Sequence, residues 1–322
     1  MPGSASRSSP ADAEPSITHL ALVGPTASGK SALALEVACG FGDVEIVSVD
    51  SMQVYRGLDI GTAKPTPEDQ ARVRHHLIDV ADPSEQWSVA RFQKEARAAV
   101  ADIEARGRRA LLVGGTGLYV QAVVDDLTFP GEDLDLRAEL EAWTAEPGGV
   151  AAAYTELSTA DPSAAARIDP HNVRRIVRAL EVIRLTGRPF SSFGPGVSAY
   201  GATAFPVAMV GIWLPRAELA RRIALRFAVM REQGLLDEVR GLAADTGGMS
   251  RTARQAIGYK ELLAHLEGEE PSLDAALDTA VRRTRAFARR QRMWFRRDPR
   301  ITWLGTTANP ERGLPALLAI WS

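Results

Sequence analysis

The sequence predicts an α/β protein: a P-loop-type parallel sheet with helices on both faces, to which a helical insertion and a helical C-terminal part are added. Two observations carry this prediction. Short apolar runs typical of buried strands alternate with helical stretches, an order that favours a parallel sheet covered on both faces. The first of these runs ends at the glycine-rich sequence GPTASGKS, residues 24–31, and a helical stretch follows it.

The expected elements follow in chain order. The apolar runs predict strands at residues 17–23, 45–50, 110–113, 205–214 and 301–304. Helices are expected at residues 31–41 and 88–106, and the second starts with Ser88, a residue type that caps helix N-termini well. After residue 215 the chain is almost wholly helical as far as about residue 298.

A chain of 322 residues fits one core domain that carries a smaller insertion. Residues 128–200 show helical patterns and no convincing strand, so we expect a helical insertion domain there and a core made of residues 17–127 and 201–322. Residues 1–16 are small, polar and Pro-rich, and they lack the apolar stretch of a signal peptide. We therefore expect a disordered tail at the N-terminus.

Composition and charge exclude few functions. The chain is 45% hydrophobic and 24% charged, and it has no apolar run long enough for a membrane helix, so we expect no membrane partner. Its single cysteine cannot form an internal disulfide, so we expect a reducing, cytoplasmic location. The net charge is only −2, but arginines cluster in residues 167–188 and 282–297, which leaves a local basic face for nucleic acid open. The single cysteine, Cys39, is expected to be a small buried side chain in an apolar helix.

Residues 24–31 match the pattern G-x-x-x-x-G-K-[ST] in full. The glycines let the backbone turn its N–H groups around phosphate oxygens, and the N-terminus of the following helix adds its dipole. Lys30 supplies a mobile cation, and the hydroxyl of Ser31 can bind Mg²⁺. A glycine turn with only a structural role is the alternative, but it leaves Lys30 unexplained. The motif therefore predicts a phosphate-binding site.

A second polar motif, DSMQVYRGLDIGTAKP, begins at Asp50, where the second predicted strand ends. Ligands of open α/β sheets bind at the carboxyl ends of the strands, so Asp50 is expected to face the bound phosphates. In a kinase such a carboxylate could hold Mg²⁺, and this alternative stays open. The polar side chains that follow, among them Ser51, Gln53, Arg56 and Thr62, imply a second substrate that forms hydrogen bonds.

These two motifs, followed by GGTGLY from residue 114, resemble the tRNA dimethylallyltransferase (isopentenyltransferase) family. The resemblance continues with RALEV at 178–182, RQAIGYKEL at 254–262 and TRAFARRQ at 284–291, and it spans about residues 18–305. It implies transfer of a dimethylallyl group from dimethylallyl diphosphate to the N6 atom of adenine 37, next to the anticodon of tRNA, with release of diphosphate. Mg²⁺ is the implied cofactor, and we expect a monomer.

The resemblance also implies roles for individual residues. Asp50 corresponds to the general base that accepts a proton from the adenine amine, and Thr116 to a residue at the target nucleotide; both are implied to be catalytic. The implied ligands of the diphosphate are Gly24, Pro25, Thr26, Ala27, Ser28, Gly29, Lys30, Ser31 and Arg226, with Mg²⁺ near Ser31. Because an adenine stacked in the anticodon loop cannot reach Asp50, the family resembles enzymes that flip a base out of the stack.

The tRNA contacts implied by the resemblance lie at both Arg-rich segments and in two loops. They are Ser51, Met52, Gln53, Thr116, Arg137, Arg174, Arg175, Arg178, Gln255, Gly258, Tyr259, Lys260, Arg285, Arg289 and Arg292. Two positions depart from the family pattern, because Arg174 stands where Gln is common and Gln255 where arginine is often found. These contacts place the anticodon stem-loop on the insertion and on the C-terminal helices.

The last Arg-rich segment, residues 273–297, supports an RNA-binding face independently. Drawn as one helix, it places Arg282, Arg285, Arg289, Arg292 and Arg296 within an arc of roughly 80°. A solvated helix face usually mixes charges of both signs, but no Asp or Glu occurs between residues 279 and 297. The pattern therefore favours contact with RNA phosphates.

Three other functions remain open from the sequence. A P-loop kinase of small metabolites would share the phosphate motif but has no need for two Arg-rich helices. An adenylate isopentenyltransferase would share the first three motifs but has no use for the insertion. A non-catalytic RNA-binding protein would leave the phosphate motif and Asp50 without a purpose. The pair His75-His76 is expected to precede a strand, and without a nearby cysteine or third histidine it does not predict a metal site.

Overall fold

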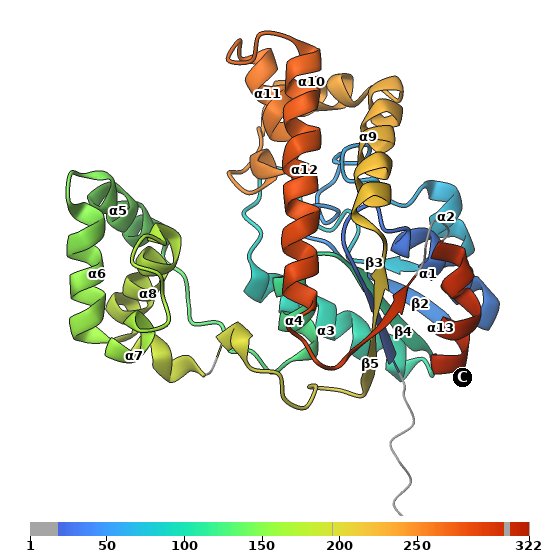
Figure 1. Ribbon diagram of the computed structural model, residues 1–322, viewed down its shortest axis with the longest axis horizontal. Coiled ribbons are helices and arrows are strands. Elements are labelled where there is room, and N and C mark those ends of the chain that lie inside the picture. The colour runs from blue at the N-terminus through green and yellow to red at the C-terminus, as the bar shows by residue number, and fades with distance from the viewer. Residues whose placement is uncertain (1–18, 195, 306–309, 322) are drawn as a thin grey trace, which may run out of the picture. The chain divides into compact units, whose positions relative to one another are not determined.

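The computed structural model describes residues 19–194, 196–305 and 310–321, so the predicted tail at residues 1–16 lies outside the described residues. The chain separates into two compact units. The first ends at Asp125 and resumes at Ala202, and the second comprises Asp126–Gly201 (Figure 1). No described helix combines the length and the apolar character that a membrane crossing would need.

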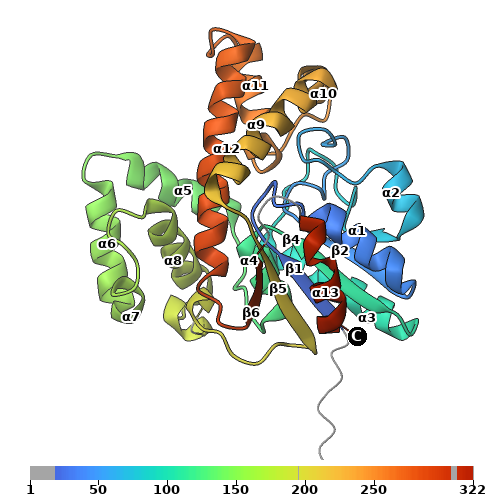
Figure 2. The ribbon, with the colours of Figure 1, turned by 45° about the vertical axis from the view of Figure 1, so that its right-hand side comes forward.

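A parallel sheet forms the centre of the first unit (Figures 1 and 2). Its strands run in the order β3-β2-β4-β1-β5-β6, and every pair of neighbours is parallel. In chain order the strands are β1 (His19–Val23), β2 (Val44–Val49), β3 (His75–His76), β4 (Arg109–Gly114), β5 (Val207–Trp213) and β6 (Ile301–Gly305). The predicted fold class is confirmed, as are the strands expected from the five apolar runs.

Helices cover both faces of this sheet. Successive residues of β1 enter different apolar cores: Ala21 lies in one cluster, Leu22 in the other. Because side chains alternate along a strand, a strand that is apolar throughout needs cover on both sides. The helices of the first unit are α1 (Lys30–Phe41), α2 (Pro67–Arg72), α3 (Val89–Ala105), α4 (Gly117–Val124), α9 (Arg216–Glu232), α10 (Leu235–Ala244), α11 (Tyr259–Leu266), α12 (Leu273–Phe295) and α13 (Leu314–Trp321). Short 3₁₀ turns occur at η3 (Ala253–Gln255) and η4 (Pro310–Gly313).

Two expectations need correction here, and one helix was missed. Cys39 is exposed, not buried, because α1 buries the face that carries Leu33, Val37 and Ala38 and Cys39 lies about 100° further round. His75–His76 do not precede a strand but form β3 themselves. Helix α2 was not expected, although Thr66 caps it in a reciprocal pair of hydrogen bonds with Asp69 and a proline occupies its first turn.

Helices are the only regular elements among the described residues of the second unit. It contains α5 (Leu134–Ala145), α6 (Gly149–Ala160), α7 (Pro162–Ala165), α8 (Val173–Thr186) and the 3₁₀ turns η1 (Phe190–Phe193) and η2 (Gly196–Ser198). Its own core includes Leu140 from α5, Leu157 from α6 and Leu180 from α8. The unit therefore has the apolar centre that a separately packed helical domain requires.

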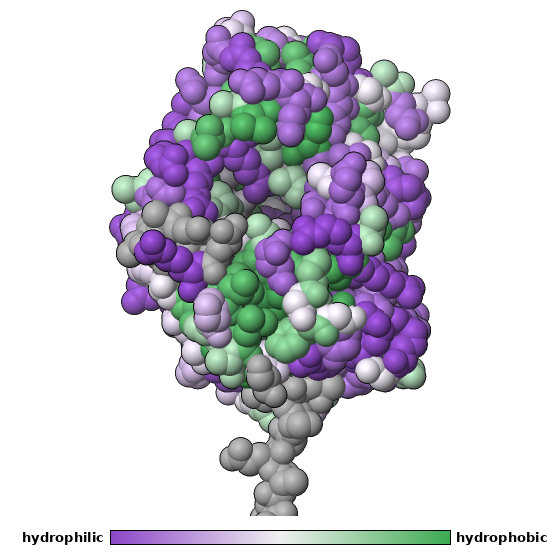
Figure 3. Space-filling view, turned by 90° about the vertical axis from the view of Figure 1, so that its right-hand side faces the viewer, coloured by the Kyte–Doolittle hydropathy of each residue, from purple (hydrophilic) through white to green (hydrophobic). Residues whose placement is uncertain are grey.

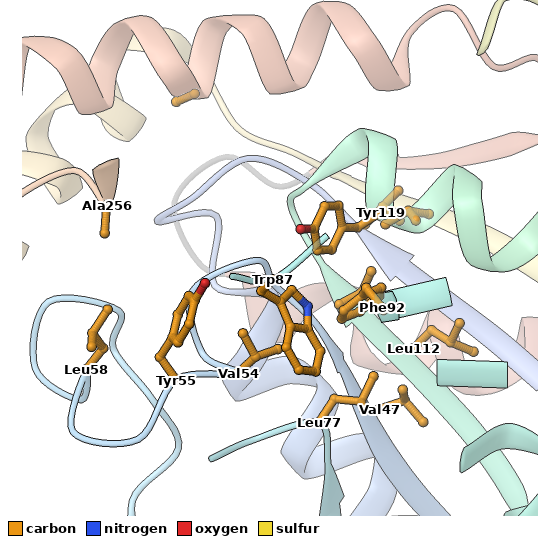
Figure 4. Close-up of a cluster of buried hydrophobic side chains, with 14 of the residues drawn as sticks. Val47, Val54, Tyr55, Leu58, Leu77, Trp87, Phe92, Leu112, Tyr119 and Ala256 are labelled. Carbon is orange, nitrogen blue, oxygen red and sulfur yellow. The ribbon is translucent and has the colours of Figure 1, made fainter. Parts of the chain in front are cut away.

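Figure 3 shows one face on which hydrophilic residues predominate, with hydrophobic residues gathered in patches between them. Beneath the surface, the loop after β2 is anchored by its apolar residues. Val54, Tyr55 and Leu58 are buried in the same cluster as Trp87 and Phe92 (Figure 4). This anchoring fixes the backbone next to Asp50, while the polar residues that follow Asp50 stay only partly buried.

Candidate active site

The carboxyl edge of the sheet brings the predicted catalytic segments together. Val23, at the end of β1, pairs with Gly114 of β4, and Gly114 pairs with Val49 of β2. The P-loop follows the first of these strands, Asp50 follows Val49, and Thr116 comes two residues after Gly114. Three segments that are far apart in the sequence therefore start side by side at one edge.

The P-loop has the backbone of an anion-binding turn. Ala27 and Gly29 adopt left-handed conformations, with φ of 61° and 86°, and Ser28 N donates to the Pro25 carbonyl at 3.3 Å. Such alternation points successive N–H groups to the same side. Among the described residues nothing caps the N-terminus of α1 with a side chain, and the buried hydroxyl of Ser28 has no hydrogen-bond partner there. These free donors suit a phosphate group.

Two cations lie at this loop. Lys30 Nζ donates to the Pro25 carbonyl at 3.4 Å, and Arg226 Nη1, from α9, donates to Thr26 Oγ1 at 3.2 Å. Burial lowers the pKa of Lys30 to about 8; the charge of Asp50 opposes this shift and that of Arg226 adds to it. Burial likewise lowers the pKa of Arg226, again opposed by Asp50. Asp50 is therefore close enough to stabilise the charge on both cations.

Asp50 is itself held by the turn that it begins. Its Oδ1 accepts hydrogen bonds from Met52 N at 2.8 Å and from Gln53 N at 3.4 Å. Among the described residues, no hydrogen bond reaches its other oxygen, Oδ2. A carboxylate with one oxygen fixed and the other open can accept a proton from a substrate. Ser51 and Met52, two predicted tRNA contacts, are partly buried beside it.

Gln53, for which a base contact stays a prediction, supports the loop through its amide. Its Nε2 donates to the carbonyls of Thr62 and Ala63, both at 3.3 Å, and its Oε1 accepts from Ser48 Oγ at 2.7 Å. The amide therefore links Ser48, in β2, to the Thr62–Ala63 part of the loop. The structure makes Gln53 a support for the loop that follows Asp50.

Glu238 of α10, which the sequence did not indicate, anchors the far part of the same loop. Its carboxylate accepts from the backbone N–H groups of Ile60 at 2.8 Å and Gly61 at 3.3 Å, and from Tyr259 Oη at 2.5 Å. A side chain at Gly61 would begin 2.3 Å from the Tyr259 ring, so this close approach requires glycine. Burial, together with Glu238, raises the pKa of Tyr259.

This anchoring bears on the predicted tRNA contacts in the RQAIGYKEL segment, residues 254–262. Tyr259 and Gly258 are buried, so they support the loop and do not present a surface to RNA. Gln255 and Lys260 are exposed, and Lys260 Nζ donates to Gln255 Oε1 at 3.1 Å. Only these two of the four positions are accessible to a partner.

A second residue without a predicted role, Gln291, joins the donor and acceptor segments. Its Oε1 accepts from Thr26 N at 2.9 Å, and its Nε2 donates to the Gly115 carbonyl at 2.8 Å. Thr116, next to Gly115, is partly buried at the start of α4, and within the described residues its side chain forms no capping hydrogen bond. The motif TRAFARRQ contains Gln291, but its spacing alone does not reveal what the amide contacts.

The arginines of α12 do not form one exposed face. Arg282, Arg285 and Arg289 are exposed, as is Arg296 just after the helix. Arg292, expected on the same arc, is buried instead. Its guanidinium lies 3.7 Å from the centre of the Trp213 ring and donates to the Leu214 carbonyl at 3.4 Å. Burial lowers the pKa of Arg292, and Arg216 and Arg296 lower it further. The aromatic residue at the end of β5 draws Arg292 inward.

Of the predicted arginines in the second unit, two are paired with a buried carboxylate and two are exposed. Arg137 donates twice to the buried Glu181, at 3.0 Å each, and Arg178 lies 3.0 Å from the same carboxylate. Although burial opposes the change, these hydrogen bonds hold the pKa of Glu181 below its usual range. Arg137 and Arg178 thus stabilise the unit internally, whereas Arg174 and Arg175 are exposed on α8.

Known proteins similar to this chain point to one family. The model of the IPP transferase family matches residues 53–298. A tRNA dimethylallyltransferase of Salinispora arenicola is 51% identical over 292 residues, which cover 91% of this chain and 83% of the relative. The protein of the same name from Streptomyces coelicolor is 48% identical over 305 residues, with 95% and 96% covered.

Solved structures agree with these relatives. The full-length tRNA isopentenylpyrophosphate transferase of Bacillus halodurans is 41% identical, with a TM-score of 0.68 and coverage of 94% of this chain and 95% of that one. A eukaryotic dimethylallyltransferase acting on tRNA is 26% identical, with a TM-score of 0.77 and coverage of 94% and 77%. The family match covers most of the chain and includes the loop after Asp50 from Gln53 onward and all of α12. The chain therefore belongs to the IPP transferase family.

Proposed function

We propose that this protein transfers a dimethylallyl group from dimethylallyl diphosphate to the N6 atom of adenine 37 in tRNA and releases diphosphate. It does so as a cytoplasmic monomer. The observation that carries the proposal is the position of Asp50, which stands beside two phosphate-binding cations, Lys30 and Arg226, with one carboxylate oxygen open. The names of its relatives, tRNA dimethylallyltransferases, supply the donor group and the acceptor.

The P-loop holds the leaving group in this proposal. The N–H groups around Ala27, the free hydroxyl of Ser28 and the two cations bind the diphosphate. Negative charge grows on the departing oxygen in the transition state, and donors already fixed in place stabilise it. The hydroxyl of Ser31, exposed in the first turn of α1, fits Mg²⁺ as a hard oxygen ligand. When bound, Mg²⁺ neutralises part of the diphosphate charge.

Asp50 acts on the acceptor. The N6 amine attacks C1 of the prenyl chain, the C1–O bond breaks, and its electron pair leaves on the diphosphate. Asp50 accepts the proton that N6 loses. Because this amine is a poor nucleophile, proton removal in the transition state accelerates the reaction, typically by about 10²–10⁴-fold. Thr116, whose hydroxyl makes no capping hydrogen bond to α4, contacts the flipped nucleotide.

The exposed arginines bind the anticodon stem-loop. In the first unit these are Arg285 and Arg289 on α12, and in the second, Arg174 and Arg175 on α8. Arginines attract the RNA backbone through its phosphates, and this attraction weakens with salt. The insertion domain, residues 128–200, is accordingly proposed as a tRNA-binding domain, and Gln255 and Lys260 as further exposed contacts.

Labelled substrate tests the proposal. The protein is incubated with Mg²⁺ and dimethylallyl diphosphate labelled in the prenyl group, together with tRNA, with the same tRNA carrying guanine in place of the target adenine, or with AMP. We expect label only on the unaltered tRNA, with stoichiometric diphosphate. Label on AMP would instead identify an adenylate isopentenyltransferase. Phosphoryl transfer from ATP to a small metabolite, without prenyl transfer, would identify a kinase.

A further inference from the structure

Gln291 is the one side chain of α12 that bonds both substrate-binding loops among the described contacts. It is buried at the face of the helix that meets the sheet edge. Its amide plane presents an acceptor to the diphosphate loop, at Thr26 N, and a donor to the acceptor loop, at the Gly115 carbonyl. Only a carboxamide offers both functions at this distance from the helix.

Gly115 leaves room for the Gln291 amide because it has no side chain. A Cβ atom on Gly115 would lie 2.5 Å from Gln291 Nε2, so any larger residue would displace the amide. Gly117, two residues further on, faces Trp294 in the same way, with a Cβ position 2.3 Å from its indole ring. The glycines on either side of Thr116 therefore let α12 seat directly on the loop that carries this residue.

We infer that Gln291 is a positioning residue for the transfer reaction: it fixes the separation between the loop that binds the diphosphate and the loop that receives the adenine. The inference rests on the proposed function. Thr26 Oγ1 also accepts a hydrogen bond from Arg226. Gln291 therefore links the residue that contacts this cation to Gly115. Displacement of reacting groups by about 1 Å can lower a rate about 10²-fold, so a rigid link between the two loops matters more for turnover than for binding.

The test is Gln291→Met, which keeps the side-chain length and removes both hydrogen bonds. We expect the single-turnover rate, with tRNA and dimethylallyl diphosphate both saturating, to fall about 10- to 100-fold. The dissociation constants of the two substrates should change by less than about threefold, because the P-loop donors and the exposed arginines are intact. The matched control is Thr284→Val, a buried change on the same helix, which should leave the rate per folded molecule unaltered.

A rate for Gln291→Met equal to that of the wild type, per folded molecule, overturns the inference. If this variant does not fold, Gln291→Glu takes its place, since it keeps an acceptor for Thr26 N and loses the donor to Gly115. A similar loss of rate supports the positioning role, and an unchanged rate contradicts it. Failure of the proposed function looks different, because then the wild-type protein itself transfers no prenyl group to tRNA.

Discussion

Charged side chains at the carboxyl edge of the sheet interact with one another, whereas those on the exposed side of α12 face solvent. At the edge, Lys30, Arg226 and Asp50 interact with one another and with the loop backbone. On α12, Arg289 is exposed, and Arg285 makes only a 3.5 Å contact with a backbone carbonyl. The edge is organised before substrate arrives, which favours chemistry. The arginines are free to meet a polyanion, which favours affinity and salt dependence.

The largest expected effect belongs to the edge. Asp50→Asn keeps the shape of the side chain but removes the proton acceptor, so kcat should fall about 10²–10⁴-fold. Binding of tRNA should change little, because the exposed arginines are untouched. Steady-state prenyl transfer and a tRNA binding titration measure both quantities. Glu68→Gln, an exposed carboxylate on α2, is the control. Near-normal turnover in Asp50→Asn would remove Asp50 from the role of base.

The second unit contains an arginine paired with a buried carboxylate, Arg137, and an exposed arginine, Arg175. Arg137→Met leaves the buried Glu181 with Arg178 and the backbone N–H of Asp133 as its remaining partners, and should destabilise this unit by about 2 kcal/mol. Arg175→Met removes an exposed charge and should cost less than about 0.5 kcal/mol. Hydrogen exchange in α5 and α8 reports the difference. Equal protection in the two variants would mean that Arg137 is not a structural residue.

Binding of the prenyl donor and binding of tRNA should depend differently on pH. With a pKa of about 8, Lys30 is charged below pH 8 and loses its proton above it. The diphosphate prefers the charged form, so affinity for dimethylallyl diphosphate should fall about tenfold between pH 7 and pH 9. Lys30→Arg should abolish this inflection, since arginine stays charged. Affinity for tRNA should not share the inflection; a common inflection would couple the two regions.

The smallest effect concerns the exposed arginines. Each phosphate contact contributes about 0.7–0.9 to the slope of log affinity against log salt. Arg285→Gln combined with Arg289→Gln should therefore lower the slope for tRNA by about 1.4–1.8. Arg292→Met, on the same helix but buried against Trp213, is the matched control and should leave the slope unchanged. The reverse pattern would place the RNA path at Arg292.

The sequence sufficed for the elements whose signal is local. Strand hydrophobicity, the P-loop glycines and the cap at Ser88 determine nearby backbone, and each strand expected from an apolar run was found. Position at a strand end also predicted that the P-loop, Asp50 and Thr116 share one edge, because parallel strands align their carboxyl ends.

What the sequence did not reveal depends on contacts between distant segments. Helical periodicity placed Arg292 beside Arg289, but Trp213, far earlier in the chain, draws it into the core. Glu238 and Gln291 likewise act on loops more than 170 residues away. The spacing of residues within one helix does not indicate contacts with segments so far away in the chain. The family resemblance implied Tyr259 as a tRNA contact, but the structure buries it against Gly61 and Glu238.

The central claim is that the sheet edge performs the transfer while the exposed arginines hold the tRNA. The single-turnover rate at saturating tRNA, measured for the variant with both Arg285→Gln and Arg289→Gln, tests it most directly. We predict a rate within about twofold of the wild type once enough tRNA is supplied, since only uniform binding has been weakened. A rate that stays far below the wild type at saturation would contradict the claim, because the arginines would then take part in the chemical step.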